Sequence, residues 1–187
     1  MVLYLTPSLL ALFACRARTV FMEAITDFEL DNVGAGPDRL SLRELATDHE
    51  FILLLFQRDH YCTNCRDQVQ DVAKRYDEFR ERDTAVVSVV PEPPEKLEQW
   101  QERYDLPFAL CADPETEISD QYDQPVRYGL LGRISDFFGR MPKAVLLDCR
   151  GAEPSVSFSH EGSSTFDRPE IDEFLAEIDR RRDDVPQ

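Results

Sequence analysis

The stretch FILLLFQRDHYCTNCRDQVQ, residues 51–70, decides the fold class, because an unbroken apolar run leads into two cysteines and a charged stretch of helical period. Six consecutive apolar residues suit a β-strand buried on both faces, as in the middle of a parallel or mixed sheet. From Tyr61 to about Arg82 the apolar residues recur every three or four positions, which predicts an amphipathic helix. Cys62 and Cys65 therefore lie at the junction between a central strand and the helix that follows it.

The segments on either side extend this pattern. Residues 84–90 read as the next strand, so a strand, a helix and a strand form a crossover unit, which we expect to be right-handed with parallel strands. Further elements are expected as follows: an edge strand at 27–30, a helix capped by Ser41, a helix opening at the prolines of 91–94, a short strand within 106–115, a short helix around Ile118 and Tyr122, a loop at 128–140, a hairpin of 143–148 with 155–159, and a final amphipathic helix carrying Ile171, Phe174, Leu175 and Ile178.

This order of elements resembles the thioredoxin fold, with Cys-x-x-Cys directly after the first central strand. Three motifs carry the resemblance: the cysteine pair, LPFALCADPE at 106–115, and MPKAVLLDCRG at 141–151. The insertion at 106–123 and the loop after it are similar to those of the larger redoxins, the alkyl hydroperoxide reductase and thiol-specific antioxidant (peroxiredoxin-like) superfamily. The resemblance covers about residues 27–179. It implies an α/β protein with a thioredoxin fold, a central mixed β-sheet flanked by helices, and a redoxin-type insertion.

The expected domain organisation is an N-terminal extension at 1–22, a redoxin domain at 23–182 and a charged tail at 183–187. The apolar stretch before Cys15 is interrupted and shorter than the roughly 20 residues that span a bilayer. Three interpretations stay open for it: a translation start at Met22, an exported or lipid-anchored form held through Cys15, and a structured segment.

The composition is strongly acidic. Acidic residues number 37 against 21 lysines and arginines, which gives a formal net charge of -16. A nucleic-acid partner is excluded, because its phosphates would be repelled. In molar salt the Debye length falls to roughly 3 Å and the self-repulsion is screened, so the balance predicts a halophilic, cytoplasmic protein. An ordinary acidic protein is the alternative.

The cysteine pair is the strongest chemical signal. A cysteine at a helix N-terminus ionises more readily than a free thiol, whose pKa is about 8.5, because the unpaired backbone N–H groups favour negative charge. Cys62 is therefore the candidate nucleophile, and Cys65, one turn further on, is the candidate resolving cysteine. A zinc site would need two more ligands, and a permanently closed structural disulfide is a further alternative. Cys111 and Cys149 are expected to be small buried hydrophobes, with Cys111 also a candidate late resolving thiol.

The family resemblance adds a candidate substrate-binding segment, Met141 and Pro142. In thioredoxin-like proteins a cis proline at this place faces the cysteine pair, and the backbone before it binds an extended substrate. The resemblance therefore implies a cis peptide bond at Pro142 and substrate binding by Met141.

Two departures from the peroxiredoxin pattern concern charge. Peroxiredoxins carry Thr or Ser three residues before the reactive cysteine, where this chain has Asp59. They also carry an Arg shortly before the late strand, and this chain lacks an Arg at the matching position. Arg58, Arg140 or Arg133 are candidate substitutes for that Arg. A carboxylate at Asp59 would disfavour the Cys62 thiolate, yet it could also accept a proton during the reaction, as could the neighbouring His60.

The sequence thus predicts a thiol–disulfide oxidoreductase that needs no metal and no organic cofactor. Its partner would be a protein or small-molecule thiol or disulfide, and the protein would be a monomer or a homodimer without a membrane span. The main alternative is a peroxiredoxin-like thiol peroxidase acting on hydroperoxides, and a third is a non-catalytic thioredoxin-like binding module.

Overall fold

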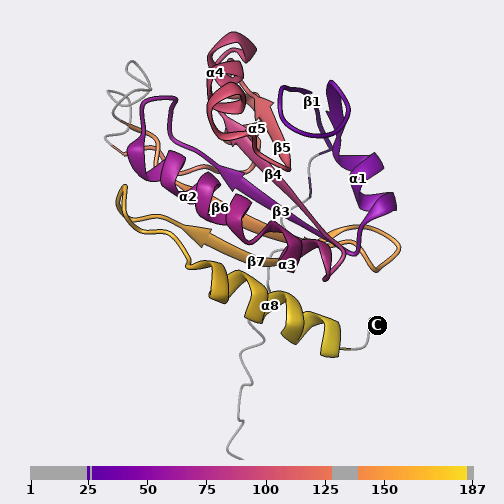
Figure 1. Cartoon of the computed structure of the whole chain (residues 1–187). Helices are drawn as coiled ribbons and strands as arrows, with labels where there is room; N and C mark the ends of the chain where they lie inside the picture. Colours follow the sequence, from indigo (N-terminus) through magenta and orange to yellow (C-terminus); the bar gives the residue numbers. More distant parts are fainter. Residues whose placement is uncertain (1–24, 26, 128–138, 185–187) are drawn as a thin grey trace, which may run out of the picture.

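The computed structural model describes residues 25, 27–127 and 139–184, and it places a seven-stranded mixed β-sheet between helices on both faces (Figure 1). The strand order is β2-β1-β5-β4-β3-β6-β7. The strands are β1 Glu29–Asn32, β2 Arg39–Ser41, β3 Phe51–Phe56, β4 Thr84–Val90, β5 Ala109–Ala112, β6 Lys143–Asp148 and β7 Ser155–Glu161. The helices are α1 Leu42–Asp48, α2 Thr63–Lys74, α3 Tyr76–Arg80, α4 Pro94–Tyr104, α5 Glu117–Gln121 and α8 Ile171–Asp183.

Strand β3 lies at the centre of the sheet, as its apolar run predicts. It pairs in parallel with β4 and antiparallel with β6. Successive side chains of β3 point to opposite faces, so Leu53 and Leu55 enter one core while Ile52 and Leu54 enter the other. Helices α2, α3, α4 and α8 cover the first core, and α1 and α5 cover the second. The thioredoxin-like α/β class, with a mixed sheet flanked by helices, is confirmed.

Two expected elements differ in detail. The helix expected from Tyr61 to about Arg82 is two helices, α2 and α3, because Arg75 leaves the helical conformation (φ −115°, ψ 16°). The Arg75 guanidinium there binds Glu78 and also Asp172 of α8. The expected edge strand starts two residues later than predicted, as β1, and β2 lies outside it as the true edge. A three-residue strand is too short to show a period of two in the sequence.

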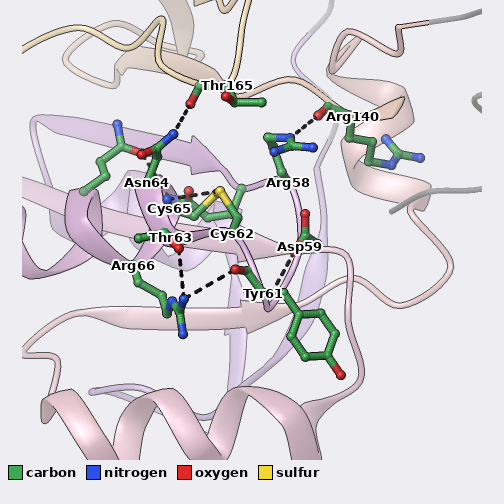
Figure 2. Close-up of a disulfide and its surroundings, with 12 residues drawn as sticks. Arg58, Asp59, Tyr61, Cys62, Thr63, Asn64, Cys65, Arg66, Arg140 and Thr165 are labelled. Atoms are coloured by element: carbon green, nitrogen blue, oxygen red, sulfur yellow. Dashed lines mark hydrogen bonds between the residues drawn. A yellow bond between two sulfur atoms is a disulfide. The ribbon is translucent and has the colours of Figure 1, made fainter. Parts of the chain in front are cut away.

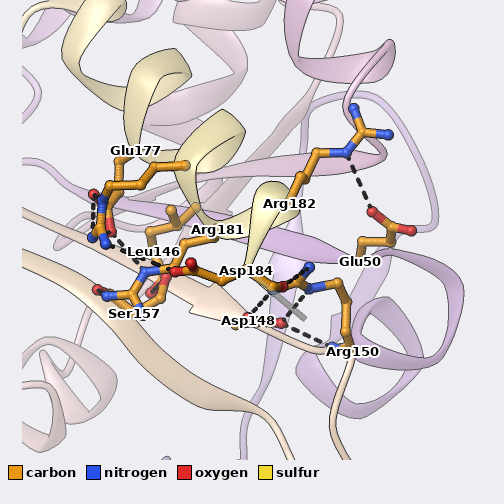
Figure 3. A network of polar contacts seen from close by, with 10 residues as sticks. Glu50, Leu146, Asp148, Arg150, Ser157, Glu177, Arg181, Arg182 and Asp184 are labelled. Carbon is orange, nitrogen blue, oxygen red and sulfur yellow. Dashed lines mark hydrogen bonds and ion pairs between the residues drawn. The ribbon is translucent and has the colours of Figure 1, made fainter. Parts of the chain in front are cut away.

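Helix α8 is fastened to the strand ends by a polar network (Figure 3). Arg150 binds the carboxylate of Asp148 at the end of β6, at 2.7 Å, and donates to the carbonyl of Asp184, the C-cap residue of α8, at 3.4 Å. Arg181 donates to the Ser157 carbonyl in β7, at 2.7 Å, and Arg182 lies 3.6 Å from a Glu50 oxygen just before β3. Arginines in the last turn also suit the negative end of the helix dipole.

The proposed division into extension, domain and tail is only partly covered by the structure. Helix α8 continues to Asp183, the first residue of the expected tail. The expected extension at 1–22, residues 185–187 and most of the loop at 128–140 lie outside the described residues. None of the helices among the residues that are described is both long and apolar enough to cross a membrane.

We expect the thermal midpoint Tm to rise when salt is raised from 0.1 M to 1 M. The chain carries a formal charge of -16, and the Debye length falls from about 10 Å to about 3 Å over this range, which screens the repulsion between carboxylates. Exposed ion pairs such as Arg43–Asp27 weaken in salt, but each contributes about 1 kcal/mol at most. Calorimetry in NaCl measures the shift, and sucrose at equal osmolality controls for solute exclusion. Equal Tm values at both salt concentrations would refute the halophilic interpretation.

Candidate active site

Cys62 and Cys65 lie at the start of α2 and are joined by a disulfide (Figure 2). Cys62 is the N-cap residue, and its sulfur accepts the backbone N–H of Cys65 at 3.1 Å, as a serine hydroxyl would at other helix starts. The side of the pair nearer to solvent is Cys62, which is 7% exposed, whereas Cys65 is fully buried. Both cysteines are thus buried, and of the two only Cys62 keeps any exposed surface, so an incoming group would meet Cys62 before Cys65.

Two arginines bring positive charge to the disulfide. Arg168 Nη2 lies 3.1 Å from Cys65 Sγ and 3.7 Å from Cys62 Sγ. Burial, and then the nearby Arg58 charge, lower the pKa of Arg168 to about 10, so it stays protonated at neutral pH. Arg58 itself donates to the Arg140 carbonyl at 2.7 Å (Figure 2). Together with the N-terminus of α2, these groups would favour a thiolate on the reduced pair.

Residues 162–169, here called the capping loop, bring Arg168 onto the disulfide. Asn64 of α2 donates to the Thr165 carbonyl at 3.0 Å, and the Arg168 guanidinium donates to the same carbonyl. At the start of the loop, a Cβ added to Gly162 would lie 2.6 Å from Pro142 Cγ, so only glycine fits this close approach. The sequence reasoning missed Arg168, because no local spacing links it to cysteines more than a hundred residues earlier.

Asp59 and His60 both lie in the turn that leads into α2. Asp59 is 7% exposed, and its Oδ1 accepts the Tyr61 backbone N–H at 2.7 Å (Figure 2). The His60 ring stacks on Trp100, with centroids 5.7 Å apart, and the pKa of His60 is lowered, mainly by burial. The Asp59 carboxylate therefore shapes the turn that presents Cys62, and His60 is neutral at neutral pH.

Comparison with known proteins agrees with this arrangement. A family model described as the AhpC/TSA family matches residues 22–149. The chain belongs to the AhpC/TSA family. Peroxiredoxin Bcp of Bacillus subtilis (strain 168) is 27% identical over 74 residues, which are 40% of this chain and 47% of that protein, so the match spans about half the length of this curated relative.

Solved structures extend the likeness in fold. Peroxidoxin BcpB from Mycobacterium tuberculosis is similar with a TM-score of 0.68 and 20% identity, over 83% of this chain and 94% of that one. The reduced 2-Cys peroxiredoxin of Plasmodium vivax is similar with a TM-score of 0.68 and 17% identity, over 84% and 93% of the two chains. At these identities the likeness shows the AhpC/TSA fold and nothing about chemistry.

The segment at Pro142 differs from the expectation drawn from thioredoxin-like relatives. The expected cis bond is wrong, because the Met141–Pro142 peptide is trans. The reason lies in the strand pairing: Arg140 bridges Val126, and the Pro142 carbonyl accepts the Gly162 N–H at 2.8 Å, so an extended backbone continues into β6.

The backbone groups of Met141 are also hydrogen-bonded within the protein. Its N–H donates to the Pro125 carbonyl at 2.8 Å, and its carbonyl accepts the Gln124 side-chain amide at 2.9 Å. The backbone groups that were expected to bind an extended substrate are thus already paired. Substrate binding by Met141 and Pro142 would require these internal hydrogen bonds to open.

Among the described residues of this AhpC/TSA member, Arg140 does not take the place of the family Arg. The Arg140 guanidinium is buried and binds Asp120 at 2.9 Å and Gln124 at 3.4 Å. Arg133 lies outside the described residues. Of the two proposed arginines that the structure describes, Arg58 is the one whose charge acts on Arg168, the arginine at the sulfurs.

The remaining cysteines are not placed for chemistry. Cys111 is buried in the core on the face of the sheet opposite to Cys62, and its burial raises its pKa strongly, so a role as late resolving thiol is unsupported. Burial, and then Asp148, raise the pKa of Cys149 to about 11. Cys111 fits the prediction of a small buried hydrophobe, whereas Cys149 is only half-buried at the edge of the same core. Among the described residues, no group of three or more His, Cys, Asp or Glu could hold a metal ion.

Proposed function

We propose that this protein is a thiol–disulfide oxidoreductase in which Cys62 is the nucleophile and Cys65 the resolving cysteine. The observation that carries the proposal is the asymmetry of the pair: Cys62, which keeps a small exposed surface at the N-terminus of α2, is bonded to the fully buried Cys65 one turn further on. A helix N-terminus favours the thiolate that such a nucleophile needs. Membership of the AhpC/TSA family supports the same chemistry.

The proposed cycle moves two electrons. The Cys62 thiolate attacks a partner disulfide, forms a mixed disulfide and releases one partner thiolate. The Cys65 thiolate then attacks the Cys62 sulfur, which closes the disulfide and releases the second partner thiolate. The dithiol is oxidised and the partner is reduced, and the reverse sequence with another dithiol restores the starting state.

The surface around Cys62 fits a protein partner as well as a small thiol. Tyr61, next to Cys62, is 60% exposed, and Phe166 in the capping loop is 80% exposed. Aromatic side chains are enriched at the centres of protein interfaces. A cytoplasmic location and a monomeric or dimeric state belong to this proposal, following the expectations from composition and family.

Thiol labelling under a series of glutathione ratios tests the proposal. We expect the fraction of Cys62 and Cys65 that can be labelled to change together with the ratio, as a single two-electron couple, and a parallel peroxide assay ranks the two activities. A pair that stays fully oxidised or fully reduced at every ratio would leave only the non-catalytic binding module.

The second candidate is a thiol peroxidase, favoured by the AhpC/TSA match. The Cys62 thiolate would attack a hydroperoxide, which gives a sulfenic acid and an alcohol, and Cys65 would condense with the sulfenic acid and release water. An external dithiol would restore the pair. Asp59 stands where peroxiredoxins carry Thr or Ser, so we rank peroxidase activity second.

Replacing Asp59 with asparagine should separate these two activities. The amide oxygen can still accept the Tyr61 N–H, so the turn is kept while the negative charge is removed. We expect the pH midpoint of Cys62 alkylation to fall by about one unit and peroxide consumption to rise, because a like charge near a thiolate disfavours it. Disulfide reduction should change less, or decline if Asp59 accepts a proton.

The matched control is Asp67→Asn, which removes an exposed carboxylate from α2 itself. An equal shift in both variants would mean that only the net charge matters. Rapid peroxide turnover by the unmodified protein would reverse the ranking of the two functions.

A further inference from the structure

We infer that Arg168 is a catalytic residue whose guanidinium stabilises the Cys65 thiolate each time the disulfide opens. The inference rests on the proposed dithiol–disulfide function and adds a group that the family motifs named above do not include. It assigns the positive charge of Arg168 to the Cys65 sulfur and not to the Cys62 sulfur.

The geometry favours Cys65. Arg168 Nη2 lies 3.1 Å from the Cys65 sulfur and 3.7 Å from the Cys62 sulfur. Cys65 is fully buried, so water cannot solvate a thiolate there, and an uncompensated buried anion is costly. A guanidinium in contact with the sulfur supplies the compensating charge.

Arg168 is itself incompletely paired while the disulfide is closed. Its Nε is buried without a hydrogen-bond partner, and no carboxylate of the described residues lies within 4.0 Å of its guanidinium nitrogens. By contrast, Arg82 and Arg140 each bind an aspartate. A half-buried cation without an anion is less stable than a paired one, and reduction of the disulfide would provide that anion at Cys65.

This placement gives Arg168 a role in both directions of the reaction. When an external thiolate attacks Cys62 Sγ, a new S–S bond forms, the Cys62–Cys65 bond breaks, and its electron pair leaves on Cys65 as a thiolate. A thiol with a more stable thiolate leaves faster. In the opposite direction, the guanidinium raises the fraction of Cys65 that is ionised and ready to attack the mixed disulfide.

The test compares Arg168→Gln with Arg66→Gln. Arg66 is also at the start of α2, where it binds the Tyr61 carbonyl and Thr63, and it makes no contact with either sulfur (Figure 2). We measure the rate at which dithiothreitol reduces the disulfide, and the pH midpoint of Cys65 ionisation in a Cys62→Ser background, read from the ultraviolet absorbance of the thiolate because Cys65 is buried. We expect Arg168→Gln to slow reduction about tenfold and to raise the pH midpoint of Cys65 by about one unit or more. Arg66→Gln should slow reduction by less than about threefold and shift the midpoint by less than about a third of a unit.

Equal effects of the two substitutions would overturn the inference, since only a general loss of positive charge would then be at work. If Arg168→Gln does not fold, the test uses the pH midpoint of Cys65 ionisation in Cys62→Ser protein with Arg168 intact. We expect it below the ordinary thiol value of about 8.5 despite burial, and a value above 8.5 would overturn the inference. A wild-type pair that never interconverts would instead refute the proposed function, so the two failures are distinguishable.

Discussion

Replacing Cys65 with serine is expected to trap the partner as a covalent adduct, and replacing Cys62 with serine to abolish the reaction. Cys62 is the cysteine of the pair that keeps some exposed surface and is the proposed nucleophile, so its loss should lower disulfide-reductase activity by about three orders of magnitude. Without Cys65 the mixed disulfide at Cys62 has no internal thiolate to resolve it. Intact mass under non-reducing conditions measures the adduct with a model disulfide.

Serine variants of Cys111 and Cys149 are the controls, because both cysteines are free in the structure and burial raises the pKa of each. Neither variant should form an adduct or lose more than about half of the activity. An adduct that accumulates in the Cys62→Ser variant, with Cys65 intact, would exchange the two assigned roles.

Replacing Phe174 with alanine is expected to destabilise the fold by about 3–5 kcal/mol. The Phe174 side chain of α8 is fully buried in the core that also contains Cys62 and Cys65. Its ring packs in a T-shaped arrangement with the Phe158 ring, with the two centroids 6.2 Å apart. The substitution removes apolar contacts and leaves a cavity that the surrounding helices and sheet can fill only in part. Urea denaturation at constant m-value measures the loss of the free energy of unfolding.

Phe166→Ala is the matched control from the neighbouring capping loop. The same side chain is removed there, but it is 80% exposed, so the free energy of unfolding should change by no more than about 0.5 kcal/mol. Comparable losses in the two variants would mean that α8 does not pack on the sheet as described. A loss of protein-partner reactivity in Phe166→Ala, with unchanged stability, would fit its proposed place at the partner surface.

The contrast between β3 and the capping loop shows which features of the structure can be predicted from the sequence. The apolar run at 51–56 and the helical period that follows specify a central strand and α2, because burial on two faces and on one face leave different periods in the chain. The cysteine pair at that junction is equally local. The central strand, the helix after it and the cysteine pair at their junction therefore follow from patterns within short windows.

Contacts between distant segments were decided only by the tertiary structure. Arg168 reaches the sulfurs across a separation of more than a hundred residues, and its approach depends on Gly162 packing against Pro142. The trans bond at Pro142 likewise follows from strand pairing with residues far along the chain. Periodicity records which face of an element is buried, but it carries no information on which distant side chain covers a given atom. The sequence by itself thus determined the cysteine pair and the strand and helix that present it. The contact of the Arg168 guanidinium with the buried Cys65 sulfur is formed only when distant segments fold together.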